Sequence, residues 1–313
     1  MATVEEICSR LCLLTRAAWE DALPPVMTRL AVSRLIDAGA LTGLTIRDTD
    51  EIPEAMRNRA RMLLSRSAAV YDCLNEYEKC GYRVVLPEEE DWPLQMRRLK
   101  ESLRPHFLFM KGCAELLGGR LIAFAGSRDI QRETYACAYE LGRKAAEEGL
   151  TIVSGGARGV DTAVQRGALE NGGKLILVPA QPVQRILRDE MLAHALAQGR
   201  LLLLCDALPD ERFSAQRAIA RNHVIYAMGE AAVVVAARAG IGGSWHGAMD
   251  CLRGAYTRVW TIDGDAADYE GNRGLLQAGA FALDLKDSLS SQCFAEAGCD
   301  QISLFDQLQI DNK

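Results

Sequence analysis

The chain has 313 residues, of which 49% are hydrophobic and 25% charged, enough to bury the cores of one large and one smaller domain. Its formal net charge of −6 excludes a protein coated with basic patches, so any contact with a nucleic acid is expected in a local groove. The N-terminus is acidic, and no apolar run has the length of a signal peptide or a bilayer span, so we expect a cytoplasmic protein without membrane contact.

Ten cysteines are spread over the chain without a Cys-x-x-Cys pair, and the four histidines do not have the spacing of metal ligands. This pattern favours reduced, buried thiols over a zinc site. We therefore expect neither a metal nor a cofactor.

Apolar residues recur at helical intervals through residues 1–75, which predicts a small helical domain. Compact helical pairs can bind the DNA backbone, but the acidic residues Asp48, Asp50 and Glu51 favour a structural or protein-contact role. Residues 76–115 are expected to form a connecting extension, with short strands over 82–87 and 107–110.

Apolar strands alternate with amphipathic helices from residue 116 to residue 285, which predicts a mostly parallel, doubly wound α/β sheet. Helices are expected over 132–148 and 184–198, and residues 286–313 form a C-terminal tail. In such a sheet, ligands bind beyond the carboxyl ends of the strands. The predicted strands cover residues 121–125, 151–154, 174–179, 201–205, 231–236 and 258–262.

A glycine-rich turn follows the second of these strands. Gly155, Gly156 and Gly159 have no Cβ, so they can adopt a positive φ and bring backbone N–H groups close to an anion, next to the N-terminus of the following helix. A tight turn needed for packing alone is the alternative, but Arg158 within the turn favours a phosphate site. Asp161 is expected to cap the helix.

Two further loops and one helix carry residues suited to anions. Gly126, Ser127 and Arg128 follow the first strand, and Gly243 and Ser244 follow the fifth. On the helix before the fifth strand, three consecutive residues offer a guanidinium, an amide and a possible cation, although a solvated polar face is the alternative. These three are Arg221, Asn222 and His223.

In this order, these motifs resemble those of the DprA/Smf family, together with Gly167-Ala168-Leu169 and the closing segment 271–280. The resemblance implies a Rossmann-like, SLOG-type core and a helical leader similar to SAM or helix-hairpin-helix domains. It also implies a protein that binds and protects single-stranded DNA, helps to load RecA recombinase during DNA uptake, and forms a homodimer. By position, Arg128, Arg158 and Arg221 would contact the DNA backbone, whereas His223 replaces a basic residue that is usual in the family.

The expected site is thus a basic groove for phosphate, without catalytic residues. A nucleotide-cleaving enzyme on the same scaffold is disfavoured, because Met249 stands where its acid would be. A sensor of free nucleotide in a defence or stress system stays open. The DNA- or phosphate-binding residues expected are Gly126, Ser127, Arg128, Ser154, Gly155, Gly156, Arg158, Gly159, Arg221, Asn222, His223, Gly243 and Ser244.

The tail contains Gln301-Ile302-Ser303-Leu304-Phe305, which resembles the short peptides that dock into the bacterial sliding clamp. Leu304 and Phe305 would fill an apolar pocket, and Gln301 would hydrogen-bond beside it. Packing of the tail on its own domain is the alternative.

Overall fold

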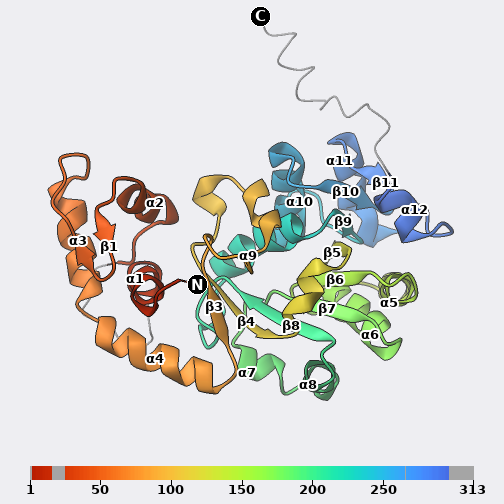
Figure 1. The fold of residues 1–313 in the computed structure, drawn as a ribbon. Helices are drawn as coiled ribbons and strands as arrows, with labels where there is room; N and C mark the ends of the chain where they lie inside the picture. Colours follow the sequence, from red (N-terminus) through yellow and green to blue (C-terminus); the bar gives the residue numbers. More distant parts are fainter. Residues whose placement is uncertain (1, 16–24, 265, 296–313) are drawn as a thin grey trace, which may run out of the picture.

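A nine-stranded sheet runs through the centre of the computed structural model, which describes residues 2–15, 25–264 and 266–295 (Figure 1). The strand order is β11-β10-β9-β5-β6-β7-β8-β4-β3. All neighbours are parallel except at one edge, where β4 is antiparallel to both β8 and β3. The strands are β3 (Arg83–Val85), β4 (Leu108–Gly112), β5 (Leu121–Ala125), β6 (Thr151–Ser154), β7 (Lys174–Leu177), β8 (Leu201–Cys205), β9 (Ala231–Val234), β10 (Arg258–Thr261) and β11 (Phe281–Ala282).

The prediction of a mostly parallel, doubly wound sheet is confirmed. The segment expected to be a connecting extension supplies β3 and β4, which continue the sheet beyond β8. The single helix expected over 184–198 is wrong, because Asp189 accepts hydrogen bonds from the N–H groups of Met191 and Leu192 and so caps a new helix. The helices of this part of the chain are α5 (Arg132–Glu147), α6 (Val160–Glu170), α7 (Val183–Ile186), α8 (Glu190–Ala197), α9 (Ala215–Met228), α10 (Gly242–Gly254), α11 (Glu270–Gln277) and α12 (Leu289–Cys293), with 3-10 turns at Leu94–Arg98, Glu101–Leu103, Ala114–Gly118 and Ala267–Tyr269.

Side chains that alternate along the strands build a core on each face of the sheet. In β5, Ile122 and Phe124 belong to the core that α5, α6 and α8 cover, whereas Leu121 and Ala123 belong to the core that α9, α10 and α11 cover. Every residue of β5, β6 and β8 is buried, as expected for parallel strands covered on both faces.

Two glycines let α5 and α6 pack in close contact. A Cβ on Gly142 would lie 2.1 Å from the carbonyl oxygen of Val164, and one on Gly167 would lie 1.9 Å from that of Tyr139. Any side chain at either position would push the helices apart. This packing fixes α6, and with it the glycine-rich turn from which α6 begins.

The N-terminal elements lie together at the β3 end of the molecule (Figure 1). They are α1 (Val4–Leu14), α2 (Arg29–Asp37), the antiparallel pair β1 (Leu41–Thr42) and β2 (Thr45–Ile46), α3 (Glu54–Leu64) and α4 (Ser67–Lys79). The helical spacing did not predict the β1–β2 pair, which turns at Gly43 with a φ of 54°. Leu13, Leu35 and Leu63 belong to a core that these elements build among themselves.

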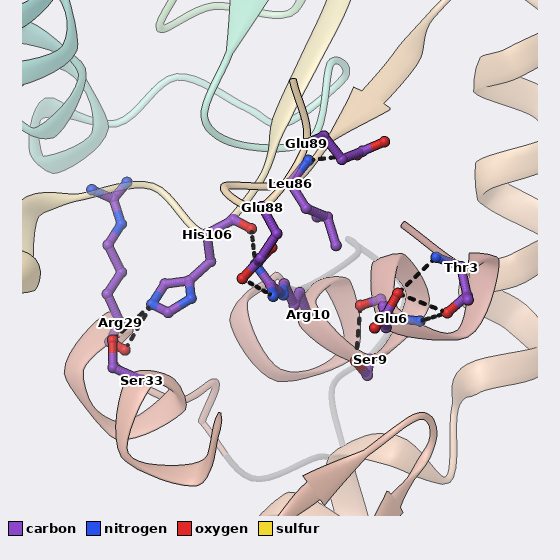
Figure 2. A network of polar contacts seen from close by, with 10 residues as sticks. All are labelled: Thr3, Glu6, Ser9, Arg10, Arg29, Ser33, Leu86, Glu88, Glu89 and His106. Atoms are coloured by element: carbon purple, nitrogen blue, oxygen red, sulfur yellow. Dashed lines mark hydrogen bonds and ion pairs between the residues drawn. The ribbon is translucent and has the colours of Figure 1, made fainter. Parts of the chain in front are cut away.

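A network of polar contacts joins the N-terminal elements to the chain around the sheet (Figure 2). The guanidinium of Arg10 in α1 donates to Glu88 (2.7 Å) and to the carbonyl oxygen of His106 (3.1 Å). The Nε2 atom of His106 lies 3.0 Å from the carbonyl oxygen of Arg29, and Arg29 pairs with Asp206 at 2.8 Å. Asp206 directly follows β8, so α2 is linked to a loop at the carboxyl edge of the sheet. No helix within the described part of the chain has the length and apolar character needed to span a bilayer.

Candidate functional site

A cavity of about 490 Å³ opens at the carboxyl ends of β5, β6 and β9. The chain runs from β5 through β6 and β7 to β8 on one side, then returns to β9 on the other side of β5. Connections therefore diverge next to β5, and a crevice forms where such connections separate. Seven of the predicted site residues line the cavity, namely Gly126, Ser127, Arg128, Arg221, Asn222, Gly243 and Ser244.

Backbone and side-chain hydrogen bonds hold the loops around this cavity together. Ser244 donates its hydroxyl to the carbonyl oxygen of Gly126 (2.7 Å), and the amide of Asn222 donates to that of Gly243 (3.0 Å). The N–H of Ser127 donates to Ala236 (2.9 Å). Asn222 and Ser244 thus fix the shape of the cavity wall through bonds to the backbone.

The glycine-rich turn supports a charged side chain from another helix. An ideal Cβ on Gly155 would lie 1.2 Å from Nη1 of Arg221, so the guanidinium occupies the space that any side chain there would need. Gly159 has a φ of 79°, and its Cβ would lie 2.3 Å from the carbonyl oxygen of Ser127. Gly155 therefore seats Arg221, and Gly159 lets the turn approach the loop after β5.

Two N–H groups of the glycine-rich turn and the start of α6 are already bonded within the protein. Ala157 donates to the carboxylate of Asp161 (3.2 Å), and Val160 donates to the carbonyl oxygen of Ser127 (3.2 Å). Helix α6 has no side-chain N-cap, so the expectation that Asp161 caps it is wrong. The carboxylate instead closes the turn from which α6 begins.

Arg221 is the buried cation of the cavity. Only 5% of it is exposed, and its Nε and Nη1 atoms have no hydrogen-bond partner in the part of the chain that the structure describes. Burial lowers its pKa, and the carboxylate of Asp161 opposes that shift. Burial likewise raises the pKa of Asp161, while Arg221 and the N–H of Ala157 lower it. A guanidinium keeps its proton in proteins, so Arg221 presents a desolvated positive charge.

Six predicted residues do not line the cavity, and two of them, Ser154 and His223, are buried side chains. Ser154 is fully buried and accepts a hydrogen bond from the amide of Gln165 (3.1 Å). His223 packs edge-on against Tyr256, with ring centroids 6.1 Å apart, and burial lowers its pKa. Residues of a helix are turned by about 100° from one to the next, so His223 points far from the direction of Arg221. The structure therefore does not bring His223 to the cavity beside Arg221 and Asn222.

Arg158 lies at a second, adjoining hollow of about 690 Å³. Its side chain is 83% exposed and lies 3.7 Å from Asp129, which also lies 4.0 Å from Arg238. Arg185, Arg212 and Phe213 were not predicted from the sequence, and they line the second hollow together with Arg128 and Arg158. One signal was present, since the large apolar Phe213 stands between Arg212 and Ser214, just before the N-cap of α9.

Gly156 belongs to the glycine-rich turn after β6, where it has a φ of 71° and lies near the side chain of Leu177. Gln301, Leu304 and Phe305 of the expected clamp-binding peptide lie outside the described residues.

The family of the chain follows from comparison with known proteins. Residues 83–293 match the model of the family described as DNA recombination-mediator protein A. This chain belongs to that family. The match confirms the resemblance that the glycine and arginine motifs carry.

Curated relatives carry the DprA name. The DNA processing protein DprA of Mycobacterium tuberculosis (strain H37Rv) is 29% identical over 196 residues, which make up 58% of this chain and 49% of that protein. The chain thus spans about half the length of that relative. The DNA processing protein DprA of Streptococcus pneumoniae (strain R6) is 43% identical over 74 residues, 24% of this chain and 26% of that protein.

Solved structures of DprA have the same fold. The crystal structure of DprA from Streptococcus pneumoniae superposes with a TM-score of 0.68 and 21% identity, covering 90% of this chain and 95% of that chain. A structure of DprA from Helicobacter pylori, described for its single-stranded DNA binding mode, gives a TM-score of 0.56 and 23% identity, covering 66% of this chain and 92% of that chain. The α/β core is therefore Rossmann-like.

Proposed function

We propose that this chain binds single-stranded DNA through phosphates held at the cavity. The observation that carries the proposal is Arg221, a buried guanidinium on the cavity wall with two nitrogen atoms unpartnered within the described residues. Leaving a buried charged donor unsatisfied is costly, so such a group favours an anionic ligand. Arginine binds phosphate oxygens with a planar pair of N–H groups, which suits this role.

The surroundings of Arg221 support a nucleic-acid strand as the ligand. Arg128 and Arg238 also line the cavity, and Arg128 continues into the second hollow, so positive charge extends beyond a single phosphate site. Contacts to phosphates bind any sequence and depend strongly on salt. The Helicobacter pylori relative, described for its single-stranded DNA binding mode, supports the same ligand here.

Membership of the recombination-mediator family supports a role in processing DNA during recombination. We further propose that the chain protects single-stranded DNA, assists the loading of RecA during DNA uptake and acts as a homodimer in the cytoplasm. The sliding clamp is a candidate partner of the tail. Protection of DNA, RecA loading and the homodimer extend the family resemblance to this chain, whereas clamp binding rests on residues 301–305 of the tail. Deleting residues after Gly298 is expected to abolish clamp binding while leaving DNA binding intact.

Fluorescence anisotropy with a labelled oligothymidylate across a salt series tests the DNA-binding proposal. We expect tight binding at low salt and a linear fall of log affinity with log salt concentration. Arg128→Glu and Arg158→Glu should each weaken binding and lower the slope. Absence of binding at every salt concentration, together with a nucleotide that raises the melting temperature, would overturn the proposal.

That last outcome would support the alternative ligand, a free nucleotide that is sensed or cleaved. The volume of the cavity lies in the range of small-molecule sites. Cleavage needs a general base, and the two carboxylates that line the cavity are both engaged: Asp161 accepts the N–H of Ala157, and Asp129 pairs with Arg158 and Arg238. The carboxylates of the cavity therefore favour binding over hydrolysis, and His246 is the other lining residue that could act as a base.

A further inference from the structure

The second hollow is an arginine-rich surface next to the cavity. Four guanidinium side chains line it, contributed by the loop after β5, the turn after β6, helix α7 and the loop before α9. These are Arg128, Arg158, Arg185 and Arg212, and all four are exposed. They come from four separate segments, so their convergence is a product of the fold.

The positive charge of this hollow is balanced only in part by neighbouring carboxylates. None of the described residues that line it is acidic. Asp129, on the rim of the first cavity, lies 3.7 Å from Arg158 and 4.0 Å from Arg238. Glu211 pairs with Arg217, and Asp210 accepts a hydrogen bond from Tyr77, so both nearby acids of the loop before α9 have other partners. Arg185 and Arg212 form no ion pair within the described part of the chain.

Phe213 joins the two hollows. It lines both of them and is 45% exposed, and the guanidinium of Arg128 lies 5.4 Å from the centroid of its ring. An exposed aromatic ring between two basic surfaces matches the arrangement by which proteins hold single strands, with phosphates on the cations and a base on the ring. A duplex does not offer an unpaired base face to such a ring.

We infer that the second hollow is a separate backbone-binding subsite, in which Arg185 and Arg212 hold the phosphates of a single strand after it leaves the Arg221 cavity and passes Phe213. The inference rests on the proposed function, because it needs the strand in the first cavity. The inference gives the path of the strand over the protein, from the carboxyl end of β5 across the loop before α9 to α7.

The test compares a long and a short ligand. The variant is Arg185→Gln with Arg212→Gln, and the charge-matched control is Arg34→Gln with Lys174→Gln, two exposed cations that line neither hollow. Binding of a long labelled oligothymidylate is measured by anisotropy across a salt series. Binding of a phosphorylated dithymidylate, too short to cover both hollows, is measured by competition.

We expect the Arg185/Arg212 variant to bind the long strand about five- to tenfold more weakly at low salt, with a salt slope smaller by about 1.4, which corresponds to two lost phosphate contacts on a single strand. Affinity for the dithymidylate should stay within about twofold of wild type, as should both affinities of the control. An unchanged slope and affinity for the long strand, while Arg221→Ala still weakens binding, would overturn the subsite and leave the proposed function standing. Absence of wild-type binding would overturn both.

Discussion

Replacing Gly155 by alanine tests how the site holds its buried cation. The new Cβ would lie 1.2 Å from Nη1 and 2.1 Å from Cζ of Arg221, so the guanidinium must move away. Gly155 is not among the glycines with a positive φ, so alanine adopts its backbone conformation without strain. The closest atoms that the new Cβ would meet thus all belong to the guanidinium of Arg221.

The expected magnitude follows from the contact that is lost. A hydrogen bond from a charged donor contributes about 2 kcal/mol, so the dissociation constant for single-stranded DNA should rise about 30-fold. The guanidinium is the far end of a flexible side chain, which keeps the cost in the free energy of unfolding near 1 kcal/mol. The variant should fold and yet bind like Arg221→Ala.

A double-mutant cycle measured by anisotropy provides the assay. Gly155→Ala, Arg221→Ala and the double variant should all bind about 30-fold more weakly than wild type, because the two substitutions remove the same contact. Gly118→Ala is the control, since its Cβ would meet no atom within 4 Å. Wild-type affinity of Gly155→Ala, or losses that multiply to about 900-fold in the double variant, would refute the reasoning.

Three further predictions concern the rim, the core and the N-terminal contact. Asp129→Ala removes the carboxylate that approaches Arg158 and Arg238, so DNA affinity should rise about two- to threefold at low salt and not at high salt; a loss of affinity in anisotropy titrations would contradict this. Asn272→Ala removes the hydrogen-bond partner of the N–H of Ala237 and of the carbonyl oxygens of Val235 and Ile262 in the core. The free energy of unfolding, measured by urea denaturation, should therefore fall by about 3 kcal/mol. A fall below about 1 kcal/mol would contradict this prediction. Burial lowers the pKa of His106 from 6.5 to about 4, so the unfolded chain binds the proton more tightly, and roughly 3 kcal/mol of stability present above pH 6.5 should be lost as the pH falls towards 4. His106→Gln should flatten that part of the stability profile, and an equally steep profile in the variant would be the contrary result.

The sequence predicted the central strands well because these strands are buried on both faces. Three of them, at 121–125, 151–154 and 201–205, begin and end where the apolar runs do. The edge strands β3 and β4 were expected as part of a connecting extension, because β4 joins the sheet by pairing with β8, about a hundred positions away, and β3 then pairs with β4. The local sequence pattern of a strand does not identify a pairing strand that lies so far away in the chain.

The site was predicted only in part, because some of its contacts join residues that are far apart in the sequence. Glycine loops at strand ends can be recognised locally, but the use of Gly155 as a seat for Arg221 depends on a helix that starts 60 residues later. Arg185 and Arg212 carry no motif, and only the folded chain brings them beside Arg158. The orientation of His223 could have been predicted from the sequence, because two residues along a helix turn its side chain by about 200° from that of Arg221.

The central claim is that buried Arg221 binds a DNA phosphate, and one titration tests it most directly. Wild type, Arg221→Ala and Arg166→Ala are titrated with the same labelled oligothymidylate at one ionic strength, after thermal melting has confirmed that each is folded. Arg166 lies on α6, is 53% exposed and pairs with Glu170, so its loss removes an equal charge outside both hollows. We predict a loss of about 30-fold for Arg221→Ala and less than about twofold for Arg166→Ala. Equal affinities of wild type and Arg221→Ala would contradict the claim.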